Sequence, residues 1–167
     1  MQDITRLVES VTREVLENAS APKVKTHMPL TAMTLETAKA LIAAVMVKAR
    51  EMGVKAVCAV TDAGGNLVAL ERMDDAFIAS IDIAINKAFT VVSLKMPTKD
   101  LATLAAPGGS LYGIQFTNGG KIVIFGGGEP LIASAKVIGG FGVSGGTAEE
   151  DTALGEYARS YFETHLA

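Results

Sequence analysis

The stretch KIVIFGGGEPLIASAKVIGGFGVSGGT, residues 121–147, constrains the fold more than any other part of the chain. Short runs rich in Val and Ile lie at Ile122–Phe125, Leu131–Ala133 and Val137–Phe141, separated by glycine clusters and one proline. Runs of this length with turn residues between them predict buried β-strands. Glycine at such turns permits positive φ and lets a second backbone or a ligand come close. The stretch therefore predicts one half of a sheet.

A helix start follows directly after this stretch. Thr147-Ala-Glu-Glu150 has the capping-box pattern, in which the threonine hydroxyl and the glutamate carboxylate each accept from a free backbone N–H. The pattern predicts a final helix over residues 147–166. Its inner face would carry Leu154, Tyr157, Ala158, Tyr161 and Phe162.

The upstream half of the domain alternates helical and strand patterns. An apolar stripe predicts a helix from the Thr34 cap to Gly53, which suits the position after a helix end. A hairpin follows, with strands at 54–61 and 67–72 joined by an Ala-Gly-Gly-Asn turn. Further predicted elements are a helix of about 75–94 capped by Asp74 or Asp75, a short helix at 98–104 and a strand at 111–116. Because tight turns join antiparallel strands, the sequence predicts an α+β domain with a central antiparallel sheet of about five strands flanked by helices.

The first 30 residues differ in pattern from the rest. Residues 1–19 predict an amphipathic helix, and residues 20–30, with two prolines and no period, predict a linker to a domain at 31–167. A short helix of this kind is marginal alone and needs a partner surface. It either packs on its own domain or a sister subunit, or docks into a hydrophobic groove of another protein. Its apolar face comprises Ile4, Leu7, Val8, Val11 and Val15.

Composition excludes several classes of function. The net charge of −3 and the absence of a basic cluster argue against nucleic-acid binding. No apolar run approaches the ~20 residues needed to cross a bilayer, and no signal-peptide core is present, so we expect a cytoplasmic protein without membrane partners. The single cysteine, Cys58, excludes an internal disulfide framework and is expected to be a core thiol.

Two sequence features that could indicate a binding site lack the context that such a site requires. GFGVSG at 140–145 matches a dinucleotide-binding fingerprint, but the βαβ unit that such a site requires does not follow it. The only histidines, His27 in the linker and His165 near the C-terminus, have no partners at metal-ligand spacing. The sequence therefore predicts glycine turns at 140–145 and no metal site.

A group of polar residues lies near strand ends and on one face of the second helix. Such groups could line a cleft beside the glycine turns, or could simply cap turns, pair with each other and face solvent. The group comprises Asp62, Arg72, Asp74, Asp82, Asn86, Lys87, Ser110 and Tyr112. The candidate ligand-binding residues are Asp62, Arg72, Asn86, Lys87 and Tyr112 together with Gly126, Gly127, Gly128 and Gly145.

Four segments together resemble the GlcG/HbpS-like family. They are VTDAGGNLVALERMDDA (60–76), INKAFTVVSLKMPT (85–98), PGGSLYGIQFTNGGKIVIFGGGEPL (107–131) and VIGGFGVSGGTAEED (137–151). The third segment is most similar to the branch found as the C-terminal domain of PduO-type corrinoid adenosyltransferases and as small proteins of diol and glycerol utilisation operons.

The resemblance implies a profilin-like α/β/α fold, a homo-oligomer, and binding of heme or a related tetrapyrrole such as a corrinoid. It carries over no catalytic residues. Some family members ligate heme through a histidine of the domain, and none occurs here between Thr31 and Thr164. His27 is therefore the possible heme ligand, provided that the linker folds back, for example across a subunit interface.

The N-terminal helix also resembles the encapsulation peptides of bacterial microcompartment cargo, whose partners are shell or cargo proteins. The leading hypothesis is an accessory binding protein of a microcompartment or a cobalamin-dependent pathway. One alternative is an enzyme that uses Lys87, Asp62 and Arg72 on a small acid or aldehyde. Another is a structural oligomer that organises cargo.

Overall fold

The computed structural model describes residues 30–167, and the predictions for the amphipathic helix and His27 lie outside this range. At its centre is a four-stranded antiparallel sheet in the order β2-β1-β4-β3. The strands are β1 (Val57–Asp62), β2 (Leu67–Arg72), β3 (Gly128–Ala133) and β4 (Lys136–Ser144). The predicted α+β class and antiparallel sheet are confirmed.

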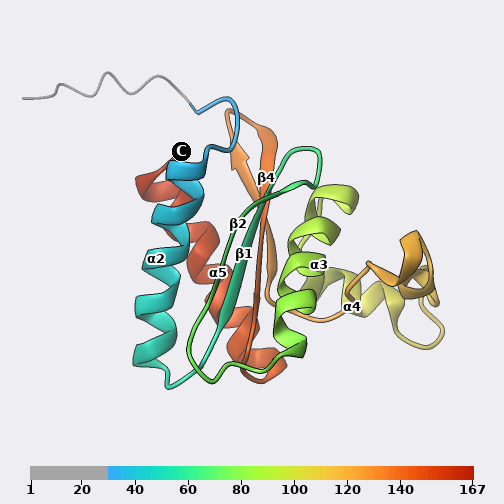
Figure 1. The fold of residues 1–167 in the computed structure, drawn as a ribbon. Helices are drawn as coiled ribbons and strands as arrows, with labels where there is room; N and C mark the ends of the chain where they lie inside the picture. The colour runs from blue at the N-terminus through green and yellow to red at the C-terminus, as the bar shows by residue number, and fades with distance from the viewer. Residues whose placement is uncertain (1–29) are drawn as a thin grey trace, which may run out of the picture.

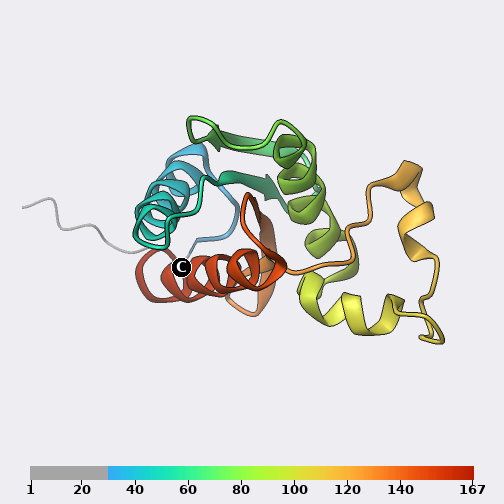
Figure 2. The same ribbon diagram turned by 90° about the horizontal axis from the view of Figure 1, so that it is seen from below.

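Helices cover both faces of this sheet (Figures 1 and 2). Helices α2 (Leu35–Glu51) and α5 (Ala148–His165) pack side by side on one face, and α3 (Ala79–Leu94) packs on the other. The short helix α4 (Thr98–Ala105) follows α3. None of the helices in residues 30–167 is both long enough and apolar enough to cross a membrane.

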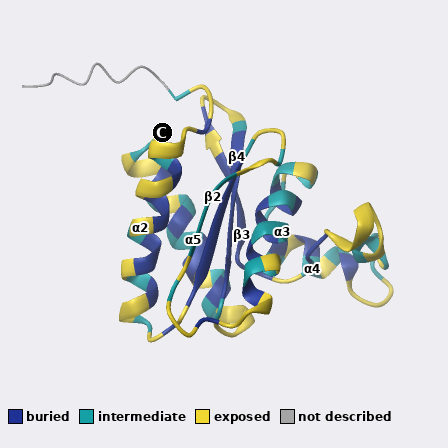
Figure 3. Ribbon diagram, in the orientation of Figure 1, coloured by how far each residue is buried: buried dark blue, intermediate teal, exposed yellow. Residues whose placement is uncertain are grey.

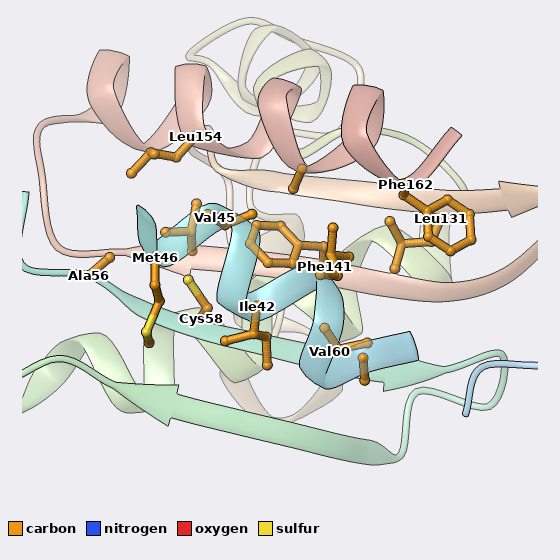
Figure 4. Close-up of a cluster of buried hydrophobic side chains, with 14 of the residues drawn as sticks. Ile42, Val45, Met46, Ala56, Cys58, Val60, Leu131, Phe141, Leu154 and Phe162 are labelled. Atoms are coloured by element: carbon orange, nitrogen blue, oxygen red, sulfur yellow. The ribbon is translucent and has the colours of Figure 1, made fainter. Parts of the chain in front are cut away.

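The main core lies between the sheet and the α2–α5 layer (Figure 4). Alternate residues of β1, Cys58 and Val60, point into it, beside Phe141 from β4 and Phe162 from α5. Burial raises the pKa of the Cys58 thiol to about 12, so it is a protonated core residue, as predicted.

Glycines let α3 lie directly on the backbone of β4. A Cβ at Gly142 would overlap the carbonyl oxygen of Ala84, and one at Gly140 would overlap that of Ala88. The other set of β1 side chains, including Val57 and Ala59, packs against the same helix. The glycines of the fingerprint-like motif thus serve close helix–sheet packing.

Two predicted strands are wrong, and the sheet accordingly has four strands instead of about five. Residues 111–116 form turns and the 3-10 helix η1 (Ile114–Phe116), followed by η2 (Asn118–Gly120). Positive φ at Gly113, Asn118 and Gly119 breaks any extended run here. This segment projects from the side of the domain and is largely exposed (Figures 2 and 3).

Residues 122–125 have the sequence pattern of a β-strand, but in the structure they pair with no strand. Ile122 and Val123 are buried, yet the Val123 N–H donates to the Thr90 hydroxyl of α3 at 3.0 Å. A helix side chain thus accepts the hydrogen bond that the carbonyl group of a neighbouring strand would otherwise accept. Apolar periodicity reports burial and cannot identify the partner.

Some helices and strands begin at residues other than those predicted from the sequence. Helix α3 begins at Ala79, later than predicted, and neither Asp74 nor Asp75 caps it, because its N-cap is Ile78 and Asp75 has a φ of 60°. Strand β1 begins at Val57, not residue 54. The Thr34 cap of α2 and the capping box between Thr147 and Glu150 of α5 are confirmed.

Candidate functional site

A hollow opens where β4 ends and where α3 and α5 begin. We call it the Phe125 hollow, and it is lined by Phe77, Ala79, Ser80, Ile83, Phe125, Ser144, Gly145, Gly146, Ala148 and Asp151. A second hollow adjoins it, sharing Phe77 and the Gly145–Gly146 turn and extending to Gly53, Lys55 and Asp75. The sheet order brings these segments together, because Ser144 of β4 pairs with Val57 of β1 at this end of the sheet.

The walls of the Phe125 hollow are apolar. Phe77 is 70% exposed and Phe125 is 40% exposed, although both are large aromatic side chains. Ile83, from the second turn of α3, completes the apolar lining. An open hollow with exposed aromatic walls is typical of sites for flat apolar ligands.

The floor of the same hollow is polar and buried. The hydroxyls of Ser80 and Ser144, from α3 and β4, lie 3.0 Å apart and form a hydrogen bond. Asp151, from the first turn of α5, accepts from the Gly146 N–H at 3.0 Å. Apolar walls with a few placed polar groups can orient a bound molecule.

Lys87 lies behind this floor and is completely buried. Its Nζ donates to an Asp151 carboxylate oxygen at 2.7 Å and to the Val143 carbonyl oxygen at 2.7 Å. The Phe125 ring lies over the ammonium, 4.7 Å from Nζ to the ring centroid. The ion pair ties α3, α5 and β4 together beneath the hollow.

Burial governs the protonation of this pair. It lowers the pKa of Lys87, against the opposing effect of Asp151, and it raises the pKa of Asp151, against the opposing effect of Lys87. Each partner therefore depends on the other to remain charged in this environment. The alternative that Lys87 is solvated is wrong.

One glycine turn fits closely around this pair, and another fits closely against the backbone just before β1. A Cβ at Gly127, whose φ is 107°, would lie 2.8 Å from the Lys87 Nζ and 2.9 Å from the Cβ of Asp151. A Cβ at Gly145 would lie 2.9 Å from the Ala56 Cα. Glycine at these two positions is therefore required by close approach.

Three of the predicted ligand-binding residues meet at or beneath the hollow, namely Lys87, Gly127 and Gly145. Gly126 and Gly128 flank Gly127 and are buried against Thr152 and Thr98 respectively.

The other four do not line the hollow. Asp62 lies at the opposite end of β1, where it accepts from the N–H groups of Gly64 and Asn66 at 2.8 and 2.9 Å and so caps the hairpin turn. Arg72 is exposed on edge strand β2, opposite Val57 and therefore at the same end of the sheet as the hollow, but it is not part of the lining. Asn86 donates to Asp82 one turn earlier in α3 at 2.8 Å, and Tyr112 is exposed in the projecting segment.

Sequence reasoning missed Asp151, Phe77, Phe125, Ser80 and Ser144. Asp151 follows the capping box directly, so its position in the first turn of a helix was predictable. Its partner Lys87, however, is 64 residues away, and no local pattern reports such a pairing. Among residues 30–167, no three His, Cys, Asp or Glu side chains gather in a way that could hold a metal ion.

The fold and this site can now be compared with known proteins. The family model described as "Haem degrading protein HbpS-like" matches residues 33–159, so the chain belongs to the HbpS-like family. This confirms the family resemblance inferred from the four sequence segments.

Among individual relatives, a 15.0 kDa protein encoded in the dhaT-dhaS intergenic region of Citrobacter freundii is 50% identical over 130 residues, covering 78% of this chain and 92% of that protein. The corrinoid adenosyltransferase PduO of the same organism is 35% identical over 133 residues, which cover 80% of this chain but 40% of that enzyme. The crystal structure of the PduOC–heme complex superposes with a TM-score of 0.75 at 35% identity, over 78% of this chain and 94% of that one.

Proposed function

We propose that this chain is an accessory protein that binds heme or a corrinoid-type tetrapyrrole and serves a bacterial microcompartment or a cobalamin-dependent catabolic pathway. The observation that carries the proposal is the similarity to PduOC, a domain crystallised with heme, over 94% of that chain at 35% identity. The relative encoded in the dhaT-dhaS intergenic region is consistent with the resemblance to small operon-encoded proteins.

The Phe125 hollow offers a physical basis for such binding. Its exposed aromatic walls suit the flat face of a macrocycle, and its buried serine hydroxyls suit oxygen-bearing substituents at the ring edge. The glycine turn at 145–146 leaves its own part of the rim free of side chains.

The enzyme alternative loses its geometric support. It needs Lys87, Asp62 and Arg72 around one substrate, but Asp62 lies at the far end of β1 from the hollow and Lys87 is enclosed by its own partners. The adenosyltransferase activity of PduO does not carry over to this chain, since the match covers only 40% of that enzyme. A structural oligomer that organises cargo remains the second candidate, and it predicts no saturable ligand.

Visible absorption spectroscopy tests the proposal. The full chain is titrated with hemin and, separately, with cobalamin, and a saturable spectral shift with defined stoichiometry is expected for at least one of them. A His27→Ala variant then tests the proposed iron ligand, whose loss should change the Soret position. Spectra that stay those of the free compounds would contradict tetrapyrrole binding.

The proposed microcompartment role has a separate test. Residues 1–20 are fused to a fluorescent reporter in cells that make shells, and a punctate signal is expected if the apolar face of Ile4, Leu7, Val8, Val11 and Val15 docks on a shell or cargo protein. A matched fusion with Leu7→Ser and Val11→Ser should give diffuse fluorescence. Diffuse fluorescence from the unaltered fusion would contradict the docking proposal.

A further inference from the structure

The Phe125 hollow presents carbon and oxygen atoms to a ligand, and the oxygens of its carboxylate are already engaged. Proteins hold heme iron with imidazole, thiolate, thioether or phenolate side chains, and none of these lines the hollow. The one carboxylate, Asp151, receives the Lys87 Nζ on one oxygen at 2.7 Å and the Gly146 N–H on the other at 3.0 Å. The lining thus fits a macrocycle better than it fits a metal.

Three side chains of the described residues that could ligate iron, His165, Cys58 and Met73, have other places in the fold. His165 stacks on Tyr161 at the C-terminal end of α5, whereas the N-terminal end of that helix borders the hollow. Eighteen helical residues separate the two ends by about 26 Å. Cys58 is enclosed in the α2-side core, and the Met73 sulfur accepts the Ala56 N–H at 3.3 Å.

His27 lies outside the described residues, and the length of chain between it and Leu30 limits its reach. It precedes Leu30 by three residues, and the chain enters the described fold near the N-terminal end of α2 (Figure 1). The hollows lie at the other end of that helix, where Gly53 and Val54 line one of them. Three residues span at most about 11 Å, whereas the 17 residues of α2 span about 26 Å. A His27 ligand for this hollow would have to come from a second copy of the chain.

The polar floor nevertheless has hydrogen-bonding capacity to spare. Two hydroxyls carry two protons, and the bond between Ser80 and Ser144 uses one of them. The second proton can be donated to a carbonyl or carboxylate oxygen at the edge of a ligand.

We infer that the Phe125 hollow recognises the macrocycle and its oxygen-bearing substituents and not the metal, so that its ligand class includes metal-free tetrapyrroles. This inference rests on the proposed function and narrows it. Binding energy comes from the aromatic walls, from Ile83 and from the serine floor, all of which act equally on a ring with or without iron.

Parallel titrations of the full chain with hemin and with protoporphyrin IX, the same ring without iron, test the inference. The two dissociation constants are expected to agree within about tenfold, since both ligands make the same contacts. Saturable binding of hemin with protoporphyrin IX at least about a hundredfold weaker would overturn the inference and leave the proposed function standing. Failure of both compounds to bind would overturn both.

Variants at two exposed phenylalanines test where the ligand binds. Phe77→Ala is expected to weaken the affinity for hemin and for protoporphyrin IX by the same factor, about tenfold, because it removes one wall of the hollow. Phe116→Ala is the matched control, since Phe116 is 83% exposed in the projecting segment and lies outside the hollow. Equal affinities of the Phe77→Ala and unaltered proteins, or a loss with hemin alone, would overturn the assignment.

Discussion

At the scale of single residues, Lys87 is the side chain whose burial requires the most compensation. A fully buried ammonium is costly unless it is paired and hydrogen-bonded, and Lys87 meets a carboxylate, a carbonyl and an aromatic face. Removing one partner leaves the other buried without its counter-charge. The pair is therefore a sensitive probe of the packing beneath the hollow.

Lys87→Met is expected to lower the free energy of unfolding by about 3–5 kcal/mol, because Asp151 is then buried without its cation. Urea denaturation measures the change. The double variant Lys87→Met, Asp151→Asn should recover part of the loss. Lys48→Met is the control, since the exposed Lys48–Glu51 pair at 3.1 Å is worth less than about 1 kcal/mol. Equal costs for Lys87→Met and Lys48→Met would contradict the account.

Asp62 gives a prediction about pH. Hydrogen bonds from Asn66 hold the pKa of the Asp62 carboxyl below its ordinary value, so its contribution to stability is present above the unfolded pKa of about 3.9 and is lost as pH falls through the folded pKa. Asp62→Ala is expected to cost about 1 kcal/mol at pH 6. The difference from the unaltered protein should shrink when urea denaturation is repeated at pH 3. A difference independent of pH would show that the carboxylate charge is not involved.

At the scale of elements, the fold depends on the contact between α3 and β4. Two glycines of β4 accept the backbone of α3 so closely that no side chain fits between them. This contact also places Ser80 and Lys87 against the end of β4, and so it builds the floor of the hollow.

Gly142→Ala is expected to destabilise the domain by about 3 kcal/mol, because the new methyl group would overlap the Ala84 carbonyl and force α3 away from the sheet. Gly119→Ala is a suitable control. A Cβ there would meet no atom within 4 Å, and only its φ of 67° opposes the substitution, at a cost of about 1 kcal/mol. Thermal unfolding compares the two, and a smaller loss for Gly142→Ala would contradict close packing as the reason for glycine.

At the scale of the whole molecule, the two core clusters of the described residues lie on the two faces of the sheet. Their first buried residues along the chain are Met33 and Val57. We therefore expect a chain that begins at Ser20 to retain the urea midpoint of the full chain. Circular dichroism measures the transition. A midpoint lower by more than about 1 M would mean that residues 1–19 pack on the domain and would weaken the proposal that they dock on a shell or cargo protein.

The sequence by itself determined the features that depend on neighbours along the chain. The Thr34 cap, the capping box at Thr147, the β1–β2 hairpin and the burial of Cys58 all follow from local patterns, and the family resemblance followed from four long segments. These features need only a few consecutive residues to specify them.

Only the tertiary structure decided which distant residues meet. It made residues 122–125 pack against α3 without strand pairing, turned 111–116 into a projecting segment, and separated Asp62 from Lys87. It also joined Lys87 to Asp151 beneath a hollow walled by Phe77 and Phe125. Periodicity says which side chains are buried, but their partners depend on the sheet order and on where glycine lets the helices approach.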